Sequence, residues 1–386
     1  MQNLVHISAE IGTSHGGSLE KAYQLIDVAV DAGADSVKFQ WVYAHEILHP
    51  NTGLVQLPGG EIPLYERFQQ LEVPASFFQQ VRDYARSKGC QFICSPFGLK
   101  SLEELAALSP DAIKIASPEL NHHPLLQRLA EIRQEQRLQG RTPVPVIISS
   151  GVSTLADIEQ ALEILSNYGE GNTQGITLLH CVTSYPAPEE EYNLQVLQNL
   201  GGIFGVEVGV SDHSLDPHLV PVLATACGAH FIEKHITLSR QTEGLDDPVA
   251  LEPAQFASMV QRVRQWETPI KNYGCQCGAS IIMEELEEEY GKDRVKSVLG
   301  TGIKKLAPAE RANYGRTNRS IHVLNDMKAG DIITQDSIAI LRTEKILEPG
   351  LAPKYFSQII GARLSKDIAA GQGVLWHHIM NVGTHC

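Results

Sequence analysis

Residues 206–214 read Val-Glu-Val-Gly-Val-Ser-Asp-His-Ser, and residues 229–237 read Ala-His-Phe-Ile-Glu-Lys-His-Ile-Thr. Each stretch is an apolar run that ends in a histidine, and one helix-length segment separates the two. This strand–helix–strand order is typical of parallel sheets, in which consecutive strands end at the same edge. His213 and His235 are therefore predicted to lie at neighbouring strand ends. Two neutral imidazoles there could bind a divalent metal, whereas either one alone could equally be an ordinary hydrogen-bonded histidine.

The same pattern of an apolar, β-branched run followed by a helical pattern occurs eight times. The predicted strands are Val5–Gly12, Ser36–Gln40, Gln91–Pro96, Ala112–Ser117, Val144–Gly151, Ile176–Val182, Val206–Ser211 and Phe231–Ile236. Eight such units predict an α/β fold, a (β/α)₈ TIM barrel whose strand ends meet at one mouth. The alternative is a doubly wound open sheet. That fold usually has fewer strands and a glycine-rich phosphate turn after the first strand, and the sequence shows neither.

The 386 residues are enough for a large barrel and a smaller module. We predict a barrel domain over residues 1–269, a connector over 270–315, and a small β-rich domain of short strands and glycine turns over 316–386. Residues 41–66 are too irregular for a helix and predict a long loop at the strand-end face. Such loops are often lids or contact substrate, although a passive surface loop is the alternative.

Composition excludes several classes of partner. The formal net charge of −14 argues against nucleic acid, whose binding needs clustered lysine and arginine. No apolar stretch approaches the roughly 20 residues of a membrane span. The chain has seven scattered cysteines, an odd number without a disulfide framework, and its first residues carry no signal-like segment. These features predict a cytoplasmic protein.

Polar side chains gather at the ends of the predicted strands. They are Glu10, Lys38, Gln40, Ser95, Lys114, Ser117, Ser149, Ser150, Tyr185, His213, Glu233 and His235. A lysine in an apolar strand is costly unless an anion pairs with it, so Lys38, Lys114 and the serines predict a phosphate or carboxylate site. A structural ion pair is the alternative for either lysine. Glu10 and Glu233 suit proton transfer. With a metal, this set suits carbon–carbon bond formation between a phosphorylated nucleophile and a carbonyl compound.

These residues resemble the sialic acid synthase family, which includes N-acetylneuraminate synthases and spore-coat polysaccharide synthases. The resemblance spans nearly the whole chain, and the C-terminal unit resembles the family's antifreeze-like SAF domain. The motifs that carry it are Ala9–Gly12, Ser14–Gly17, Gly33–Gln40, Ser95–Phe97, Lys114–Ser117, Ser149–Gly151, His180–Pro186, Ser211–His213 and Glu233–His235.

The resemblance implies condensation of phosphoenolpyruvate with N-acetylmannosamine or a related hexosamine, releasing phosphate and a nonulosonic acid. By position, His213 and His235 match the ligands of Mn²⁺ or Mg²⁺. The residues that match the phosphoenolpyruvate site are Lys38, Gln40, Ser95, Lys114, Ser117, Ser149 and Ser150. Catalytic or sugar-contacting positions match Glu10, Lys38, Tyr185, Glu233, Asp246 and Arg342. Arg342 is in the small domain, which in the family covers the partner's barrel, so a domain-swapped homodimer is implied.

The sequence departs from the family pattern mainly near the expected sugar end. Leu245 precedes Asp246 and Asp247 where a proline is common, which leaves open which aspartate is equivalent. Val152 stands where the family usually has methionine. The acceptor sugar therefore stays open. Another barrel enzyme that makes a shorter keto sugar acid is the nearest alternative, but the C-terminal domain disfavours it. A sugar-binding relative without catalysis is disfavoured by the intact Glu10 and Lys114.

Overall fold

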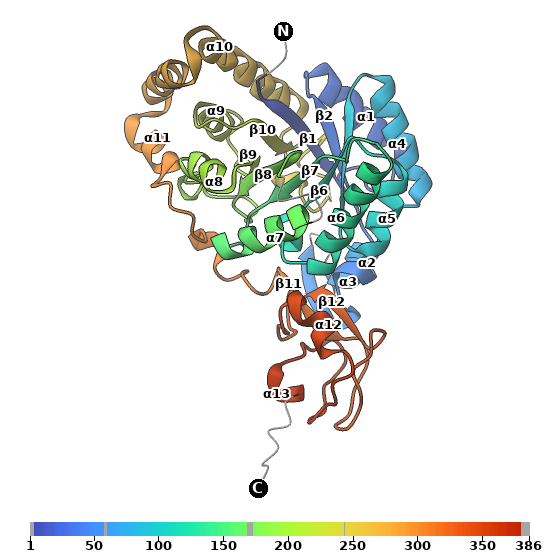
Figure 1. The fold of residues 1–386 in the computed structure, drawn as a ribbon. Helices are drawn as coiled ribbons and strands as arrows, with labels where there is room; N and C mark the ends of the chain where they lie inside the picture. Colours follow the sequence, from blue (N-terminus) through green and yellow to red (C-terminus); the bar gives the residue numbers. More distant parts are fainter. Residues whose placement is uncertain (1–3, 58–59, 168–172, 243, 380–386) are drawn as a thin grey trace.

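The eight predicted strands form a closed parallel barrel in the computed structural model, which describes residues 4–57, 60–167, 173–242 and 244–379. The barrel strands are β1 (His6–Gly12), β2 (Ser36–Trp41), β5 (Gln91–Pro96), β6 (Ala112–Ile115), β7 (Val146–Ser149), β8 (Ile176–Cys181), β9 (Glu207–Asp212) and β10 (Phe231–His235). Their order around the barrel follows the chain, and β10 pairs with β1 to close it (Figure 1). The TIM-barrel prediction is confirmed.

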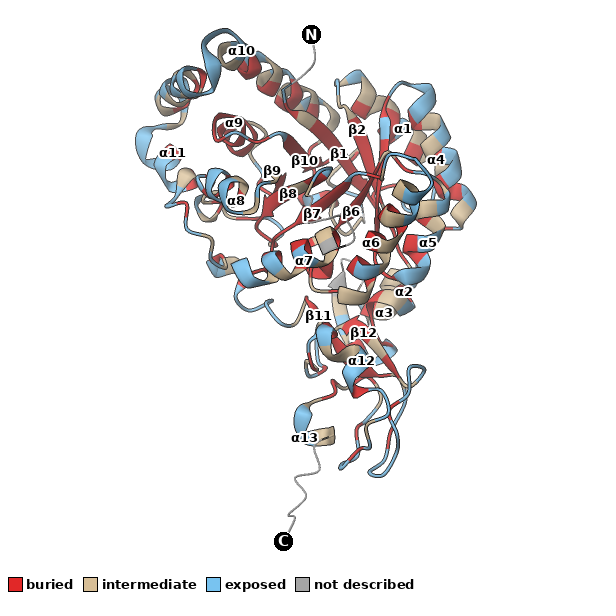
Figure 2. Cartoon of the chain, viewed as in Figure 1, coloured by how far each residue is buried: buried red, intermediate tan, exposed pale blue. Residues whose placement is uncertain are grey.

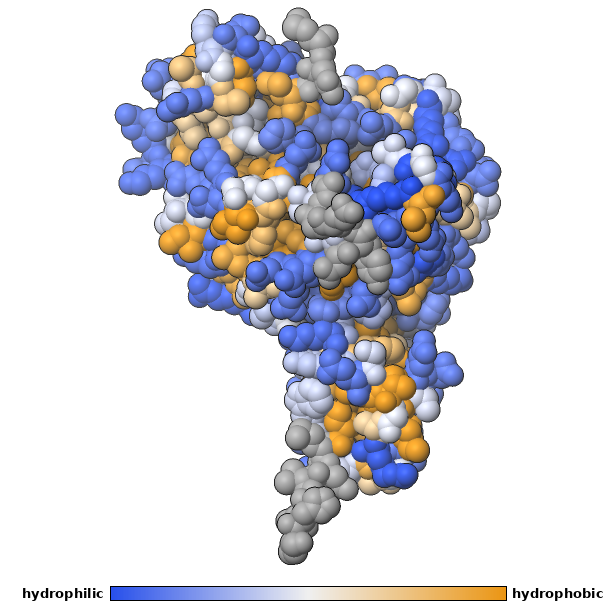
Figure 3. All heavy atoms as spheres, viewed as in Figure 1, coloured by the Kyte–Doolittle hydropathy of each residue, from blue (hydrophilic) through white to orange (hydrophobic). Residues whose placement is uncertain are grey.

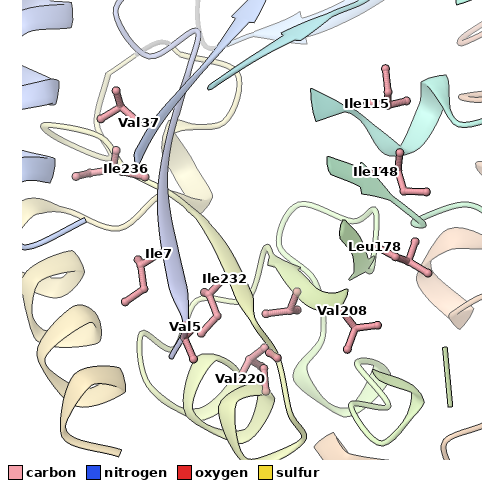
Figure 4. Packing of buried hydrophobic residues seen from close by; sticks show 14 of the residues in the cluster. Val5, Ile7, Val37, Ile115, Ile148, Leu178, Val208, Val220, Ile232 and Ile236 are labelled. Atoms are coloured by element: carbon pink, nitrogen blue, oxygen red, sulfur yellow. The ribbon is translucent and has the colours of Figure 1, made fainter. Parts of the chain in front are cut away.

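The barrel has an apolar core on each side of its wall because side chains along a strand alternate between the two faces. A small interior cluster includes Ile93, Ile147 and Leu179, all nearly inaccessible to solvent. The opposite faces pack against the helices in a much larger cluster. Figure 4 shows Val5 and Ile232 of that cluster close to Val220 on a surrounding helix. This packing leaves the carboxyl ends of the strands to carry polar residues.

The outer layer consists of helices that pack against the barrel, most of them with one face buried (Figures 1 and 2). They are α1 (Leu19–Asp31), α4 (Ala75–Ser87), α5 (Leu99–Ala107), α6 (His123–Leu138), α7 (Leu155–Asn167), α8 (Val196–Phe204), α9 (Leu219–Ala226) and α10 (Pro253–Tyr290). In α1, the Ser18 side chain caps the first turn by accepting a hydrogen bond from the amide of Lys21. No helix in the described ranges is long and apolar enough to cross a membrane.

Residues 41–66 are more ordered than the sequence indicated. They contain the short helix α2 (Ala44–Ile47), the hairpin of β3 (Leu54–Leu57) and β4 (Gly60–Pro63), and the start of α3 (Leu64–Gln69). Residues 58–59 lie outside the described ranges. Apolar side chains from this segment, among them Ile47 and Leu64, form a cluster of their own with Phe97. Because these apolar positions are few and widely spaced, no helical or strand period was visible in the sequence.

The boundary expected at residue 269 falls inside α10. This helix continues to Tyr290 across a kink at Gly274, whose φ is 80°, and α11 (Lys292–Leu299) follows. Ile282, Leu286 and Val295 of this region are buried in the main core beside the barrel. Residues 270–299 of the predicted connector therefore pack as part of the barrel domain. Residues 300–318 cross to the small domain through the short 3₁₀ helix η5 (Pro308–Glu310) and a series of turns, and this segment is the connector.

The small domain has its own core. Strands β11 (Arg319–Val323) and β12 (Ile338–Arg342) pair antiparallel, and single bridges such as Met327 with Ile368 tie the turns together. The short helices α12 (Phe356–Ile359) and α13 (Trp376–Ile379) complete it, and residues 380–386 lie outside the described ranges. The domain projects from one end of the barrel, and apolar residues gather on its visible face (Figure 3).

Candidate active site

Two buried lysines and two buried glutamates form a charge network inside the mouth of the barrel. Lys38 Nζ lies 2.9 Å from Glu10 Oε2 and 3.5 Å from Glu233 Oε2, and Lys114 Nζ lies 3.3 Å from Glu233 Oε1. Their side chains are at most 4% exposed. The register explains the proximity, since Glu10 on β1 is the strand partner of Lys38 on β2. Each lysine thus forms the structural ion pair that was the alternative to an anion site. An anionic substrate would therefore have to share Lys38 and Lys114 with Glu10 and Glu233.

The two glutamates differ in their proton affinity. Burial raises the pKa of Glu10 to about 7, although Lys38 opposes the shift. Burial alone would also raise the pKa of Glu233, but Lys114, Lys38 and a hydrogen bond from Ser211 lower it to about 2. Glu10 can therefore take up or release a proton near neutral pH, whereas Glu233 stays charged. Gln40 donates to Glu10 Oε1 at 2.8 Å and holds this carboxyl group in place.

The predicted serines surround the same network, and they differ in whether their hydroxyl groups already have hydrogen-bond partners. Ser95 Oγ lies 3.4 Å from Lys38 Nζ, and Ser117 Oγ accepts a hydrogen bond from the amide of Gly151 at 3.0 Å. Ser150 Oγ donates to the carbonyl oxygen of Leu179 at 3.1 Å. Ser149 Oγ is buried and finds no hydrogen-bond partner among the described residues. A buried hydroxyl without a partner is costly, so Ser149 is the serine best placed to bind a ligand.

His213 and His235 lie together at the ends of β9 and β10, with their ring centroids 5.4 Å apart. His213 Nδ1 is 3.0 Å from the carbonyl oxygen of Val182, a contact that leaves Nε2 available to bind a metal. His235 Nδ1 is buried, has no hydrogen-bond partner among the described residues, and lies 3.9 Å from Asp246 Oδ2. Tyr185, which is 49% exposed, stacks on His213 at 4.3 Å.

This pair fits the divalent metal that the resemblance implies. Within the described ranges, no three His, Cys, Asp or Glu side chains are grouped closely enough to hold an ion by themselves. The two imidazoles, one of which has a ring nitrogen without a hydrogen-bond partner, suit an ion whose other coordination positions are filled by water or substrate.

The structure separates Asp246 from Asp247. Asp247 is fully buried, and its carboxylate accepts hydrogen bonds from Ser14 Oγ at 2.5 Å, from Thr242 Oγ1, and from the amide of Gly244 at 2.9 Å. Its oxygens are thus occupied by hydrogen bonds that hold the loop. Asp246 instead faces His235 across 3.9 Å. Of the two aspartates that the sequence left open, Asp246 is therefore the one whose carboxylate lies beside the histidines.

Arg342 reaches the mouth of the barrel in its own chain. Its Nε and Nη2 donate to Glu119 Oε1 at 3.1 and 2.7 Å, just beyond the end of β6. Arg319, fully buried, donates to the same oxygen from Nη2 at 3.0 Å and to the carbonyl oxygen of Phe97 at 2.7 Å. The resemblance implied that Arg342 acts on a partner subunit, but these contacts are made within one chain.

Sequence reasoning missed Glu119 and Arg319 as the link between the domains. Glu119 was visible as a polar residue shortly after Lys114 and Ser117, at a strand end. Arg319 gave no signal, because an arginine at the start of a strand is ordinarily a surface residue.

Comparisons with known proteins agree with this geometry. A model of the NeuB family matches residues 25–273, and a SAF domain model matches residues 318–380. The spore coat polysaccharide biosynthesis protein SpsE of Bacillus subtilis is 33% identical over 97% of this chain and 94% of its own. Its crystal structure superposes with a TM-score of 0.77 at 32% identity, covering 98% of this chain and 96% of that one.

A second relative is named for its enzymatic activity. The N,N'-diacetyllegionaminic acid synthase of Legionella pneumophila is 31% identical over 97% of this chain and 94% of its own. A solved N-acetylneuraminic acid synthetase from Leptospira borgpetersenii, in complex with citrate, is 30% identical with a TM-score of 0.61, over 76% of this chain and 93% of that one. With the barrel, the small domain and the strand-end site all in place, the chain belongs to the NeuB family.

Proposed function

We propose that the protein condenses phosphoenolpyruvate with N-acetylmannosamine or a related hexosamine to give a nonulosonic acid and phosphate. The observation that carries the proposal is the placement of Lys38, Lys114, Glu10 and Glu233 beside two histidines at the mouth of a NeuB-family barrel. The family contains synthases of sialic-type acids, which supports a synthase role for this chain.

Phosphoenolpyruvate would bind at the side of the mouth where lysines and serines gather. Lys38 and Lys114 supply positive charge to its carboxylate and phosphate, and Ser95, Ser117, Ser149 and Ser150 supply hydroxyl groups. The unpartnered Ser149 Oγ supports this placement, because a bound anion would satisfy it. Glu233, held charged between the two lysines, keeps both amino groups oriented towards the same point.

The reaction forms a bond between C3 of phosphoenolpyruvate and the aldehyde carbon of the open-chain sugar. The aldehyde oxygen takes a proton and becomes a hydroxyl group, while a water oxygen adds to C2 of phosphoenolpyruvate. Phosphate then leaves C2, the water-derived hydroxyl loses its proton, and a ketone remains. Glu10 is suited to accept the proton of this water, since its pKa of about 7 lets the carboxylate act as a base at neutral pH.

The acceptor sugar would lie beside His213 and His235. A Mn²⁺ or Mg²⁺ ion bound there would polarise the aldehyde oxygen. Tyr185 and Asp246 lie against the two histidines, where they can contact the sugar or orient water. We expect His213→Ala and His235→Ala to lose Mn²⁺ binding measured by electron paramagnetic resonance with circular dichroism unchanged. Retained Mn²⁺ affinity in both variants would refute this metal assignment.

The cellular location and the oligomeric state of the enzyme are also part of the proposal. The six cysteines in the described ranges are free thiols, which supports a reducing, cytoplasmic location. The resemblance implies a homodimer with exchanged small domains. In the single chain, Arg342 reaches the mouth of its own barrel.

The proposal is tested by incubating the protein with phosphoenolpyruvate, Mn²⁺ and a panel of aldoses while phosphate release is measured. We expect release that depends on a hexosamine, with one keto acid formed per phosphate. Release with a pentose or tetrose instead would favour the enzyme class that makes shorter keto sugar acids. Sugar binding without phosphate release from any acceptor would indicate a non-catalytic relative and would overturn the proposal.

A further inference from the structure

The turn that follows β7 contains a strained residue. Val152 has a φ of 42°, a left-handed conformation that a β-branched residue rarely adopts. It comes directly after Ser149, Ser150 and Gly151, the hydroxyl-bearing end of the strand. Such strain persists only where surrounding contacts impose it, and it is concentrated at functional sites.

Side chains of the connector bind the backbone of this turn one group after another. Lys304 Nζ donates to the carbonyl oxygen of Ser150 at 2.8 Å. Glu310 Oε1 accepts from the amide of Val152 at 2.7 Å, and Asn318 Nδ2 donates to the carbonyl oxygen of Val152 at 3.0 Å. Both sides of the strained residue are thus held by residues more than 150 positions later in the chain, with separations of 158 and 166.

Glu310 also fixes the neighbouring strand end. The same Oε1 accepts from the amide of Thr183, just after β8, at 2.8 Å, and Oε2 accepts from the amide of Ala307 at 3.1 Å. The residue is 1% exposed. A buried carboxylate that accepts several backbone amide hydrogen bonds is strongly held, so it sets the spacing between the ends of β7 and β8.

The turn leaves little freedom at its centre. A Cβ atom on Gly151 would lie 2.0 Å from Thr183 Oγ1 and 2.8 Å from Ser117 Oγ, so these groups already fill the space. The amide of Gly151 donates to Ser117 Oγ at 3.0 Å. A shift of Val152 would therefore move Gly151, and with it the hydroxyl groups of Ser117 and Ser149.

We propose that Glu310 and Asn318 are positioning residues that impose the left-handed conformation of Val152 and thereby shape the anion side of the site. They act through the turn and touch no substrate. The inference rests on the proposed function, because it assigns the binding of phosphoenolpyruvate to the side of the mouth that this turn forms.

The chain offers a matched control for the test. Glu191 Oε2 accepts from the amide of Ala309 at 2.9 Å, so it anchors the same connector without touching the turn. If Glu310 only anchored the connector, replacing either glutamate with alanine, which leaves no acceptor oxygen, would have similar effects. If Glu310 holds the turn, only its replacement changes the affinity for the anionic substrate.

Steady-state kinetics of Glu310→Ala and Glu191→Ala separate these outcomes. We expect Glu310→Ala to raise the KM for phosphoenolpyruvate roughly tenfold, which corresponds to about 1.4 kcal/mol. The KM for the acceptor and kcat should stay within about twofold, and Glu191→Ala should resemble the wild type. Equal changes in both KM values, or an unchanged KM for phosphoenolpyruvate, would overturn the proposal.

A second substitution tests the strain itself. Glycine adopts a positive φ without steric cost, so Val152→Gly no longer needs the clamp to hold that conformation. In the Glu310→Ala background, we expect Val152→Gly to recover a substantial part of the affinity for phosphoenolpyruvate. A further loss in the double variant would count against a role for Glu310 in holding Val152.

Amide hydrogen exchange in the substrate-free protein separates failure of this inference from failure of the proposed function. We expect faster exchange at Val152 and Thr183 in Glu310→Ala and no change there in Glu191→Ala. If the wild type binds no phosphoenolpyruvate, the proposed function fails. Unchanged exchange at both amides would then overturn the clamp independently.

Discussion

Asp246 and Asp247 show how two adjacent, identical residues acquire different tasks. We expect Asp247→Ala to cost about 3 kcal/mol of stability, because Ser14, Thr242 and Gly244 lose a charged acceptor. Asp246→Ala, which removes a side chain without these bonds, should change stability by less than about 0.5 kcal/mol and lower turnover instead. Thermal unfolding and phosphate release measure the two effects. A loss of stability in Asp246→Ala and a loss of turnover alone in Asp247→Ala would exchange the two assignments.

Glu10 gives the reaction a predictable dependence on pH. Because its pKa is about 7, the carboxylate is largely protonated at pH 6 and largely ionised at pH 8. If it acts as the base, kcat rises as the pH passes through 7, and Glu10→Gln lowers kcat by about 10²–10⁴-fold and removes this rise.

Glu233→Gln is the control for that titration. The pKa of Glu233 is about 2, so its charge does not change in the tested range. Its replacement should slow the reaction and keep a single rise, shifted to lower pH because the charge of Glu233 helps to raise the pKa of Glu10. A wild-type rate that is flat from pH 6 to 8 would exclude Glu10 as the titrating base.

Candidate site residues could be predicted where the type of side chain is unusual for its position in a strand. Lys38 and Lys114 were recognisable because a lysine inside an apolar strand needs an anionic partner. The sequence could not show that both lysines share Glu233, since that depends on the register of strands far apart in the chain. Nor could it show that Asp247 is occupied by Ser14, a contact between residues 233 positions apart.

At the scale of elements, all eight barrel strands were predictable because each is a continuous apolar run between turn signals. The hairpin of β3 and β4 and the helix α3 were not, since they bury only isolated apolar residues. The second half of α10 was also missed in the sequence, because a kink at Gly274 interrupts its helical period. Such segments are recognised only once the surface that they cover is known.

The contact between β11 and the barrel depends on Arg319. We expect Arg319→Met to destabilise the docking of the small domain by about 3 kcal/mol, because Glu119 and the carbonyl oxygen of Phe97 lose a buried donor. Limited proteolysis should then release the small domain more quickly. Arg363→Met is the control, since Arg363 is exposed and donates only within the small domain, to Gly330. Equal cleavage rates in both variants would contradict this role.

At the scale of the whole molecule, the origin of Arg342 in each site can be measured. A chain with His213→Ala is mixed with a chain with Arg342→Ala. Because Arg342 contacts Glu119 of its own chain, we expect no recovery of activity. Exchanged small domains would instead rebuild about a quarter of the sites in random dimers. The sequence could not decide between these arrangements, because the same residues form the contact in both.

The connector that clamps Val152 also affects the order in which the protein matures. A ribosome releases the chain from its N-terminus, and domains generally begin to fold as they emerge. All eight barrel strands have been synthesised by residue 235, whereas Glu310 and Asn318 follow much later. A nascent barrel can therefore close before its turn after β7 is set. If Glu310 and Asn318 set this turn, tight binding of a charged metabolite begins only after residue 318 has left the ribosome.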